Sequence, residues 1–458
     1  MDICTHWFQK IDNLLWQPLF VILLGVGAFL TVRLRFLQFR KLPYALKLAF
    51  SRHDHTAVGD ISHFQALMTA LAATIGIGNI AGIATAVTMG GLGSLFWLWV
   101  TTMIGMSTKY VEALLAVKYR VQDEKGNMAG GPMFYIRRGL NWKWLAGFFA
   151  LFGAIATITT GNIVQSNSIS EVVTTYFHVD PWVTGIILAA VTGAVLIGGI
   201  RSIGGVTSLL VPFMALFYVL GSMGILAFNI GVVPEALMSI LRSAFTGQAA
   251  MGGFVGSTVM MAVQMGVARG VFSNESGLGS APIAAAAAKT DYPGRQALVS
   301  MTGAFISTIV CTFTGLAIAV TKVLGYIGDN GKILTGSRLT ALAFDHGIPF
   351  GGYIVVLCCI FFGYSTIVGW AYYGEKCSEY LLGRRSTPWY RFIFTICVFL
   401  GVLIPIDIVW PLADIANAFM ALPNLIALVA LSSVAVKESD HFFLQVGREK
   451  GLKLPDAA

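Results

Sequence analysis

The sequence predicts an all-α integral membrane protein, because of its composition and the apolar segments that recur along it. Hydrophobic residues make up 56% of the 458 residues and charged residues only 11%, whereas a soluble domain carries about 25% charged residues. The mean hydropathy is +0.76. The 51 glycines and 14 prolines fit the same class, since membrane helices tolerate both. This composition excludes a soluble enzyme, a disordered chain and a disulfide-rich secreted module.

About eleven segments are long and apolar enough to cross a bilayer, which takes about 20 residues. They are 14–32, 63–88, 95–117, 143–176, 181–200, 206–230, 252–288, 296–324, 351–377, 389–406 and 409–436. The segment 252–288 is too long for one uninterrupted span. The polar stretches between the segments are loops, and none is long enough to hide a soluble domain.

The distribution of Lys and Arg predicts the orientation of these segments. If the amino terminus lies outside, 23 of the 30 Lys and Arg residues fall on the side of the carboxyl terminus, and 5 fall on the other. Cytoplasmic loops are enriched in Lys and Arg, so we expect a multi-pass plasma-membrane protein with a cytoplasmic carboxyl terminus. The formal charge of +8 then orients loops in the lipid bilayer, and we expect no nucleic-acid partner.

Two segments carry residues that a continuous helix disfavours. Residues 74–82 include Gly76, Gly78 and Asn79, and residues 266–280 include four glycines with Arg269 and Glu275. Backbone that is unwound at membrane depth is costly unless it lines a cavity or a ligand. The half-helix ends can bind anions through N–H groups and cations through carbonyls. Close packing through small residues explains isolated glycines, but it needs no Asn, Arg or Glu.

The two interruptions open two sets of five segments that cross the membrane in opposite senses. We therefore divide the chain into an amino-terminal helix and basic loop (1–62), two repeats (63–230 and 231–436) and a tail (437–458). Paired interruptions at matching positions indicate a secondary transporter site. The alternatives are a channel and a membrane sensor that only binds its ligand. We expect no enzymatic activity, and because no P-loop is present we expect no use of ATP.

Several sequence blocks, in this order, resemble the alanine/glycine:cation symporter family (the sodium:alanine symporters) of bacteria and archaea. The blocks are 74–82, Gly105-Met106 with Lys109-Tyr110 and Glu112, 130–133, Gly161-Asn162 with Gln165 and Asn167-Ser168, 268–282 and 365–376. The resemblance implies a LeuT-type inverted repeat of 5+5 helices with one extra amino-terminal helix, in the cell (inner) membrane. It also implies sodium-coupled import of small neutral amino acids, such as alanine and glycine, by alternating access. A proton-coupled or glutamine-preferring carrier of the same fold is the alternative.

The amides of residues 76–79 are the candidates for the substrate carboxylate, since glycine permits close approach to the backbone. The resemblance implies that Asn79 contacts sodium or substrate through its amide oxygen; a helix cap at the break is the alternative. Many members of the family carry Thr where this chain has Ile77, which offers only its backbone. The predicted substrate-binding residues are Gly76, Ile77, Gly78, Asn79, Gln165, Gly270, Phe272, Thr366 and Trp370.

Sodium is a hard cation that should prefer oxygen ligands, and it is the coupling ion; no other cofactor is expected. Ser365 and Thr366 supply hydroxyls, and similarity to the second sodium site of LeuT-type carriers adds the carbonyls of Ala72 and Ile75. The alternative is that both hydroxyls bond to their own helix backbone. Trp370 lies one turn beyond Thr366 and is expected either to wall the pocket or to pack as an ordinary aromatic.

Four charged residues lie at membrane depth. Lys109 and Glu112 are three residues apart and are expected to pair on one helix face. Arg269 and Glu275 flank the second interruption and are expected to form a gate or a charge pair. No histidine lies in the middle of a span, which removes the easiest proton carrier, but Glu275 or Glu112 could still couple transport to protons.

Overall fold

Helices form nearly all of the structure, a computed structural model that describes residues 2–51, 58–123, 126–246, 258–328, 331–404 and 406–449. In the first half of the chain they are α1 (Asp2–Arg33), α2 (Leu37–Ala49), α3 (His63–Thr74), η1 (Ile77–Asn79), α4 (Ala81–Gly90), α5 (Gly93–Lys118), α6 (Pro132–Gly139), α7 (Lys143–Ile158), η2 (Thr159–Ile163), α8 (Val164–Phe177), α9 (Pro181–Ile197) and α10 (Gly199–Phe228). A two-residue antiparallel hairpin, β1 (Val121–Gln122) with β2 (Met128–Ala129), follows α5.

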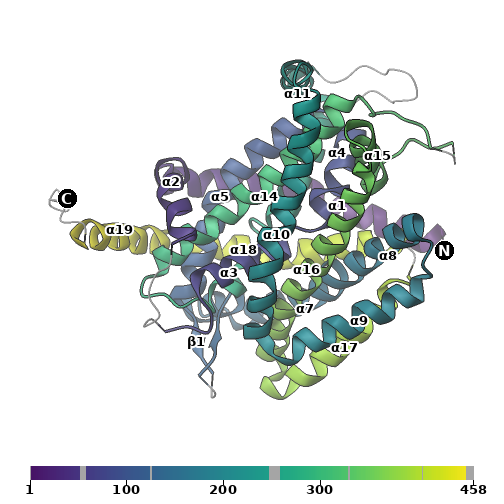
Figure 1. Cartoon of the computed structure of the whole chain (residues 1–458). Helices are drawn as coiled ribbons and strands as arrows, with labels where there is room; N and C mark the ends of the chain where they lie inside the picture. Colours follow the sequence, from purple (N-terminus) through teal and green to yellow (C-terminus); the bar gives the residue numbers. More distant parts are fainter. Residues whose placement is uncertain are drawn as a thin grey trace.

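The second half continues in the same way (Figure 1). Its helices are α11 (Val233–Thr246), α12 (Val259–Asn274), α13 (Ala281–Ala285), α14 (Pro293–Thr321), α15 (Gly336–Gly347), α16 (Gly351–Leu382), η3 (Arg384–Ser386), α17 (Thr387–Gly401), α18 (Ile406–Ala430) and α19 (Ser432–Glu449). Local sequence signals determine where several of the helices begin. Ser62 and Gln65 form a capping box on α3, and Pro181 and Pro293 occupy the first turns of α9 and α14.

The predicted spans correspond to helices throughout the described part of the chain. Six helical runs there are each long and apolar enough to cross a membrane, and a bent pair, His63–Thr74 with Ile77–Gly90, makes a seventh. The predicted span 95–117 lies within α5, whereas the spans 181–200 and 389–406 overlap α9 and α17, which end earlier, at Ile197 and Gly401. The start of the predicted span 252–288 lies outside the described residues. The count of eleven spans stays a prediction, whereas the all-helical membrane class is confirmed.

Both predicted interruptions are present. The first bends the chain by 62° between α3 and the η1–α4 segment. The second ends α12 at Asn274 and is followed by turns up to α13. Helix α5 packs against α12 and α14, and α16 packs against α3, α7 and α8. The two interruptions therefore lie between α5 and α14 on one side and α7, α8 and α16 on the other.

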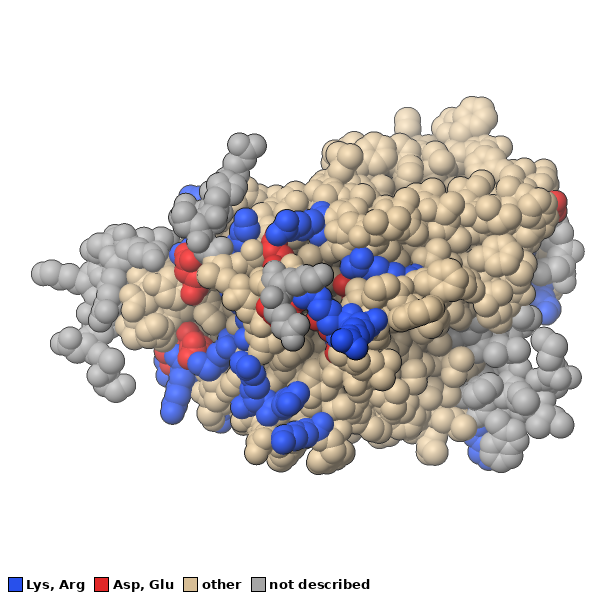
Figure 2. Space-filling model, turned by 90° about the horizontal axis from the view of Figure 1, so that it is seen from below, with Lys and Arg blue, Asp and Glu red and all other residues tan. Residues whose placement is uncertain are grey.

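The outer helices present large apolar side chains to their surroundings, as lipid-facing helices do. Exposed examples on α9, α10 and α17 are Ile186, Ile187, Leu209, Phe213, Leu216, Phe392 and Ile393. Figure 2 shows Lys and Arg gathered on the face that carries the β1–β2 hairpin in Figure 1. Five of the cations that the charge split assigns to the cytoplasm line one cavity there: Arg201, Lys376, Arg384, Arg385 and Arg391.

Candidate substrate and ion site

The first break leaves two backbone N–H groups without partners. Helix α3 ends at Thr74, and the short helix η1 starts at Ile77. The Gly76 N–H donates to Asn79 Oδ1 at 3.2 Å, and the Asn79 N–H donates to the Gly76 carbonyl at 3.0 Å. The N–H groups of Ile77 and Gly78 have no acceptor among the described residues. Of the predicted amides 76–79, these two are free to bind an anion.

Asn79 acts as the cap of this break. Its amide oxygen accepts from Gly76, and its Nδ2 donates to Ser307 Oγ of α14 at 2.8 Å. The side chain is fully buried. It therefore fixes the bend against α14, and it also lines the small cavity described below. The predicted capping role is present, and a contact of Asn79 with sodium or substrate stays a prediction.

A π-helical turn positions Gln165. The segment η2 joins α7 to α8, and such turns leave backbone carbonyls displaced from the regular ladder. Gln165 Nε2 donates to the Thr160 carbonyl in this turn at 3.2 Å. Gln165 Oε1 is buried and has no partner among the described residues. A Cβ placed on Gly76 would lie 3.5 Å from this oxygen, so the free acceptor lies close to the first break.

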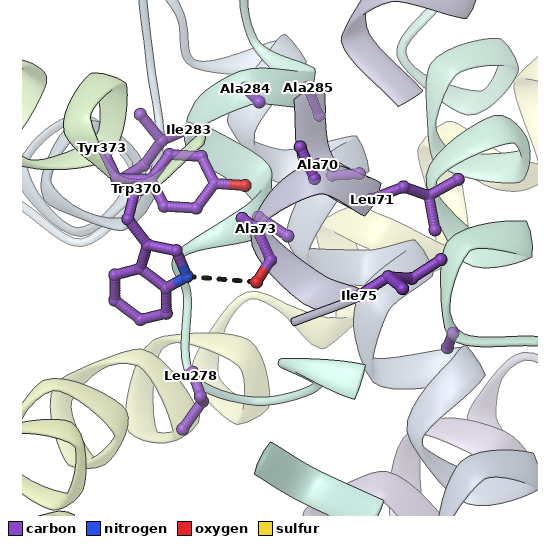
Figure 3. Close-up of a cluster of buried hydrophobic side chains, with 14 of the residues drawn as sticks. Ala70, Leu71, Ala73, Ile75, Leu278, Ile283, Ala284, Ala285, Trp370 and Tyr373 are labelled. Carbon is purple, nitrogen blue, oxygen red and sulfur yellow. Dashed lines mark hydrogen bonds between the residues drawn. The ribbon is translucent and has the colours of Figure 1, made fainter. Parts of the chain in front are cut away.

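Trp370 of α16 contacts the end of α3. Its Nε1 donates to the Ala73 carbonyl at 3.3 Å, and Figure 3 shows the indole facing Ala73, with Leu278 of the second break below it in the view. Gly161 of η2 lies directly against it, because a Cβ there would be 2.2 Å from Trp370 Cβ. The indole therefore both packs in the core and forms a wall of the cavity.

The predicted sodium ligands meet at the end of α3. Thr366 Oγ1 donates to the Ala72 carbonyl at 3.0 Å, and Ser365 Oγ reaches the same oxygen at 3.3 Å. Each hydroxyl also lies 2.9 Å from the Phe362 carbonyl of its own helix, as the alternative predicted. The Ile75 carbonyl accepts no hydrogen bond from the described residues. This set of buried, uncharged oxygens fits a sodium ion.

A cavity of about 340 Å³, counting all space between atoms, lies between the two breaks. Seven of the nine predicted substrate residues line it: Gly76, Gly78, Asn79, Gln165, Phe272, Thr366 and Trp370. Ile77 instead lines a separate, larger cavity. Gly270 packs against α5, where a Cβ would lie 2.9 Å from Thr101 Cβ. Close helix packing, and not the cavity, accounts for the glycine at position 270.

Residues 1–455 match the family described as the Sodium:alanine symporter family. The chain belongs to this family. The sodium/alanine symporter AgcS of Methanococcus maripaludis is 54% identical over 95% of this chain and 96% of its own. An uncharacterized transporter of Haemophilus influenzae is 49% identical over 95% of each chain. MhsT, solved in complex with L-phenylalanine, has a TM-score of 0.58 at 14% identity, over 83% of this chain and 92% of its own. This structural similarity confirms the LeuT-type fold.

In this member of the sodium:alanine symporter family, Glu112 holds the second break. Glu112 Oε1 accepts from the N–H groups of Gly277 and Gly279, each at 3.1 Å, and from Asn424 Nδ2 at 2.6 Å. Both glycines have positive φ, +92° and +80°. A side chain at either position would be strained, and its Cβ would meet another residue within 2.7 Å. Glycine therefore forms this turn without the strain that a side chain at either position would add.

The expected pair of Lys109 and Glu112 is not formed. No ion pair joins the two side chains among the described residues, and Lys109 Nζ instead donates to the Asn274 carbonyl at 2.7 Å. The expectation was wrong because it considered one helix face only. Both side chains extend from α5 to the second break. There they form hydrogen bonds with backbone groups that have no partner within a helix.

Arg269 separates the small cavity from a larger one. Its guanidinium lies 5.8 Å from the ring centroids of both Phe272 and Trp410. Phe272 lines the small cavity, whereas Arg269 and Trp410 line a cavity of about 1160 Å³ beside α4 and α15. Arg269 and Glu275 form no ion pair among the described residues. The alternative of a charge pair is therefore wrong, and Arg269 belongs to a stacked partition between the cavities.

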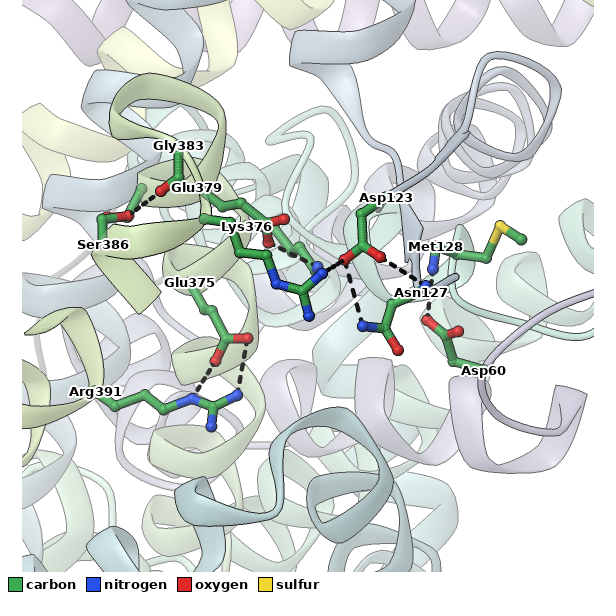
Figure 4. A network of polar contacts seen from close by, with 12 residues as sticks. Asp60, Asp123, Asn127, Met128, Glu375, Lys376, Glu379, Gly383, Ser386 and Arg391 are labelled. Atoms are coloured by element: carbon green, nitrogen blue, oxygen red, sulfur yellow. Dashed lines mark hydrogen bonds and ion pairs between the residues drawn. The ribbon is translucent and has the colours of Figure 1, made fainter. Parts of the chain in front are cut away.

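On the opposite side lies a charged cavity of about 1580 Å³ (Figure 4). Arg384 pairs with Asp123 of the hairpin at 2.9 Å, and Arg391 pairs with Glu375 at 2.7 Å. The first contact joins the hairpin to η3, and the second joins α16 to α17. Asp60 accepts from the Met128 N–H at 2.9 Å. Burial raises the pKa of the Asp60 carboxyl, and this hydrogen bond only partly offsets the effect.

Sequence reasoning missed several residues that line the small cavity. They are Ala73, Thr74, Thr160, Ser273, Leu278 and Asn417, together with Glu275, which was expected only as a gate or pair. Asn417 Nδ2 donates to Thr160 Oγ1 at 2.9 Å. An isolated Asn in an apolar span is a signal that could have identified Asn417. Glu275 Oε2 accepts from Ser280 at 2.8 Å, while its buried Oε1 has no partner in the described part of the chain.

Proposed function

We propose that the protein is a sodium-coupled secondary transporter that imports small neutral amino acids, such as alanine and glycine, by alternating access. One observation carries the proposal. The free N–H group of Gly78 and the free amide oxygen of Gln165 lie at the same small cavity, and the free N–H group of the preceding residue, Ile77, belongs to the same short helix η1. Free amides suit the carboxylate of a zwitterion, and a free oxygen suits its ammonium group. Both the family and its member AgcS are named for sodium:alanine symport.

Sodium is the coupling ion, and Thr366 links it to the substrate. Its hydroxyl belongs to the proposed set with Ala72, Ile75 and Ser365, and its side chain also lines the cavity. Because the first break supplies both the Ala72 carbonyl and the free amides, an ion at α3 would fix the backbone that binds the amino acid. Binding of either ligand would then favour binding of the other.

The small cavity lies between two larger ones, and this arrangement supports alternating access. The partition of Arg269, Phe272 and Trp410 lies on one side, and the charged network of Figure 4 lies on the other. In the proposed orientation the charged network is cytoplasmic, together with the carboxyl terminus, and the protein lies in the plasma membrane. Residues 63–230 and 231–436 are the two proposed repeats, between an amino-terminal unit (1–62) and a tail (437–458).

Purified full-length protein in proteoliposomes tests the proposal. An inward sodium gradient should drive accumulation of labelled alanine above its external concentration, and replacing sodium with potassium should abolish it. Uptake that only equilibrates alanine would indicate a channel, and binding without uptake would indicate a sensor. Accumulation driven by a proton gradient alone would overturn sodium coupling.

Competition with labelled alanine tests the substrate class. Unlabelled alanine and glycine should compete strongly, while arginine and glutamate should not, because neither the amides nor Gln165 balances an extra charge. Stronger competition by glutamine would contradict the small substrate and favour the glutamine-preferring alternative.

A further inference from the structure

Lys109 lies where the two interrupted helices end. Its side chain is 1% exposed, and its Nζ donates to the carbonyl of Asn274, the last residue of α12, at 2.7 Å. The same Nζ lies 3.4 Å from Oγ1 of Thr74, the last residue of α3. One ammonium group from α5 thus contacts the carboxyl-terminal residues of both half-helices.

This position has the properties of a cation site. The carboxyl-terminal end of a helix has up to four carbonyls without intrahelical donors and a partial negative charge of about half an elementary charge. Two such ends converge here, from α3 and α12. Glu112 lies one turn from Lys109 on α5, and Glu275 directly follows Asn274, so two carboxyl groups lie beside the same helix end. A positive charge at this position compensates the negative potential of the two helix ends.

We propose that the Lys109 ammonium is a built-in cation that fills an ion site between the two broken helices, so that one sodium ion accompanies each amino acid. The sodium is the one bound by Ala72, Ile75, Ser365 and Thr366, and the proposal therefore rests on the proposed function. Thr74, Ser273 and Glu275 line the substrate cavity beside the two helix ends that Lys109 holds. The ammonium keeps these ends together at any sodium concentration, whereas a mobile ion would do so only when bound.

The coupling ratio of the unaltered protein tests this directly. In proteoliposomes, the membrane potential that stops net alanine flux at fixed gradients gives the number of sodium ions per alanine. We expect one. A ratio of two would overturn the role of Lys109 while leaving sodium-coupled transport intact, whereas the absence of sodium-driven flux would refute the proposed function itself.

Two substitutions distinguish the effect of the Lys109 charge from the effect of the volume of its side chain. Lys109→Met keeps the stem and removes the charge, so alanine binding should weaken about tenfold or more, as the loss of a charge-assisted hydrogen bond predicts. Added sodium should not restore binding, because the Met side chain fills the site. Lys109→Ala opens the site to an ion, so high sodium should restore alanine binding, with the Hill coefficient for sodium rising from about 1 to about 2.

Lys118→Ala is the matched control, since this lysine belongs to the same helix but pairs at the surface with Glu438. It should leave alanine affinity and the sodium Hill coefficient unchanged. A Lys109→Met protein that binds alanine normally, or a Lys109→Ala protein with an unchanged Hill coefficient, would overturn the proposal. If Lys109→Ala fails to fold, the coupling ratio of the unaltered protein still tests the proposal.

Discussion

Lys109 and Glu112 lie one turn apart on α5, yet they bind opposite sides of the same chain break. Lys109 Nζ donates to the Asn274 carbonyl before the turn, and Glu112 Oε1 accepts from the Gly277 and Gly279 N–H groups within it. The cation thus meets a freed carbonyl and the anion meets freed N–H groups. A single helix face provides the charges that keep an unwound segment stable away from water.

Replacing Glu112 should destabilise the protein strongly. Glu112→Ala removes the acceptor of three buried hydrogen bonds, and each buried donor left unpaired costs about 1–3 kcal/mol. Glu112→Gln keeps an oxygen and should lose less. Thermal unfolding of the purified protein in detergent measures the effect, with Glu438→Gln at the surface as the control. Equal melting temperatures for Glu112→Ala and the unaltered protein would show that the turn does not need this carboxylate.

Replacing Thr366 should weaken sodium binding. Thr366→Val keeps the shape and removes the hydroxyl that reaches Ala72. A loss of ~1.4 kcal/mol corresponds to about a tenfold higher sodium concentration for half-maximal uptake. Thr366→Ser should be milder, because the hydroxyl remains.

Thr395→Val is the control for that substitution, since among the described residues the Thr395 hydroxyl bonds only to the Arg391 carbonyl of its own helix. It should leave sodium dependence unchanged. If Thr366→Val behaves in the same way at normal protein levels, then Thr366 only bonds to its own helix and packs.

Replacing Trp370 should widen substrate choice. Trp370→Phe removes part of the cavity wall and the hydrogen bond to Ala73. A hydrophobic pocket discriminates against one methylene group by about 1–3 kcal/mol, so the preference for alanine over valine should fall at least about tenfold. Competition assays measure this. Trp182→Phe, at a 54% exposed tryptophan on α9, should keep the original preference.

Gly161→Ala should distort the cavity wall, because Gly161 lies directly against Trp370. The new Cβ would lie 2.2 Å from Trp370 Cβ, so either the indole or the π-helical turn must move. Overpacking of this kind costs about 1–3 kcal/mol, and alanine affinity should fall by about tenfold. Gly147→Ala, with no atom within 4 Å of its Cβ position, should bind alanine normally. Normal affinity in Gly161→Ala would contradict a fixed Trp370 wall.

A reporter fused after Ala458 tests the proposed orientation. The bias of Lys and Arg predicts a cytoplasmic carboxyl terminus, so a reporter that works only in the cytoplasm should be active. A reporter that works only outside the cytoplasm should be silent. The reverse pattern would overturn the orientation and assign the cavity of Figure 4 to the outside.

Local sequence signals predicted the backbone of the site well. Glycines beside Asn79 and Glu275 mark both breaks, since these residues disfavour helix wherever they lie. The same signal misled at Gly270, which serves helix packing against Thr101. Glycine alone does not distinguish an unwound backbone from a close helix contact.

Local patterns could not predict long-range contacts, and only the family resemblance brought Ala72 together with Thr366. Asn417 reaches Thr160 across 257 positions of the chain, and Lys109 reaches Asn274 across 165. No local pattern encodes which polar groups the fold brings together. The predicted pair of Lys109 and Glu112 does not form for this reason. Lys109 instead bonds to the last residue of α12, and Glu112 bonds to the turn that follows it.

The hydroxyls of Ser365 and Thr366 each have two acceptors within reach, the Ala72 carbonyl and the Phe362 carbonyl. When the hydroxyl hydrogens point to Ala72, every polar group of this set except the Ile75 carbonyl is satisfied without an ion. When they rotate to Phe362, the hydroxyl oxygens and the Ala72 carbonyl all become electron-pair donors toward sodium. Binding of sodium at the proposed site would then require only a bond rotation on the picosecond-to-nanosecond scale and no rearrangement of the backbone, and without an ion the Ile75 carbonyl is the one oxygen of this set with no donor among the described residues.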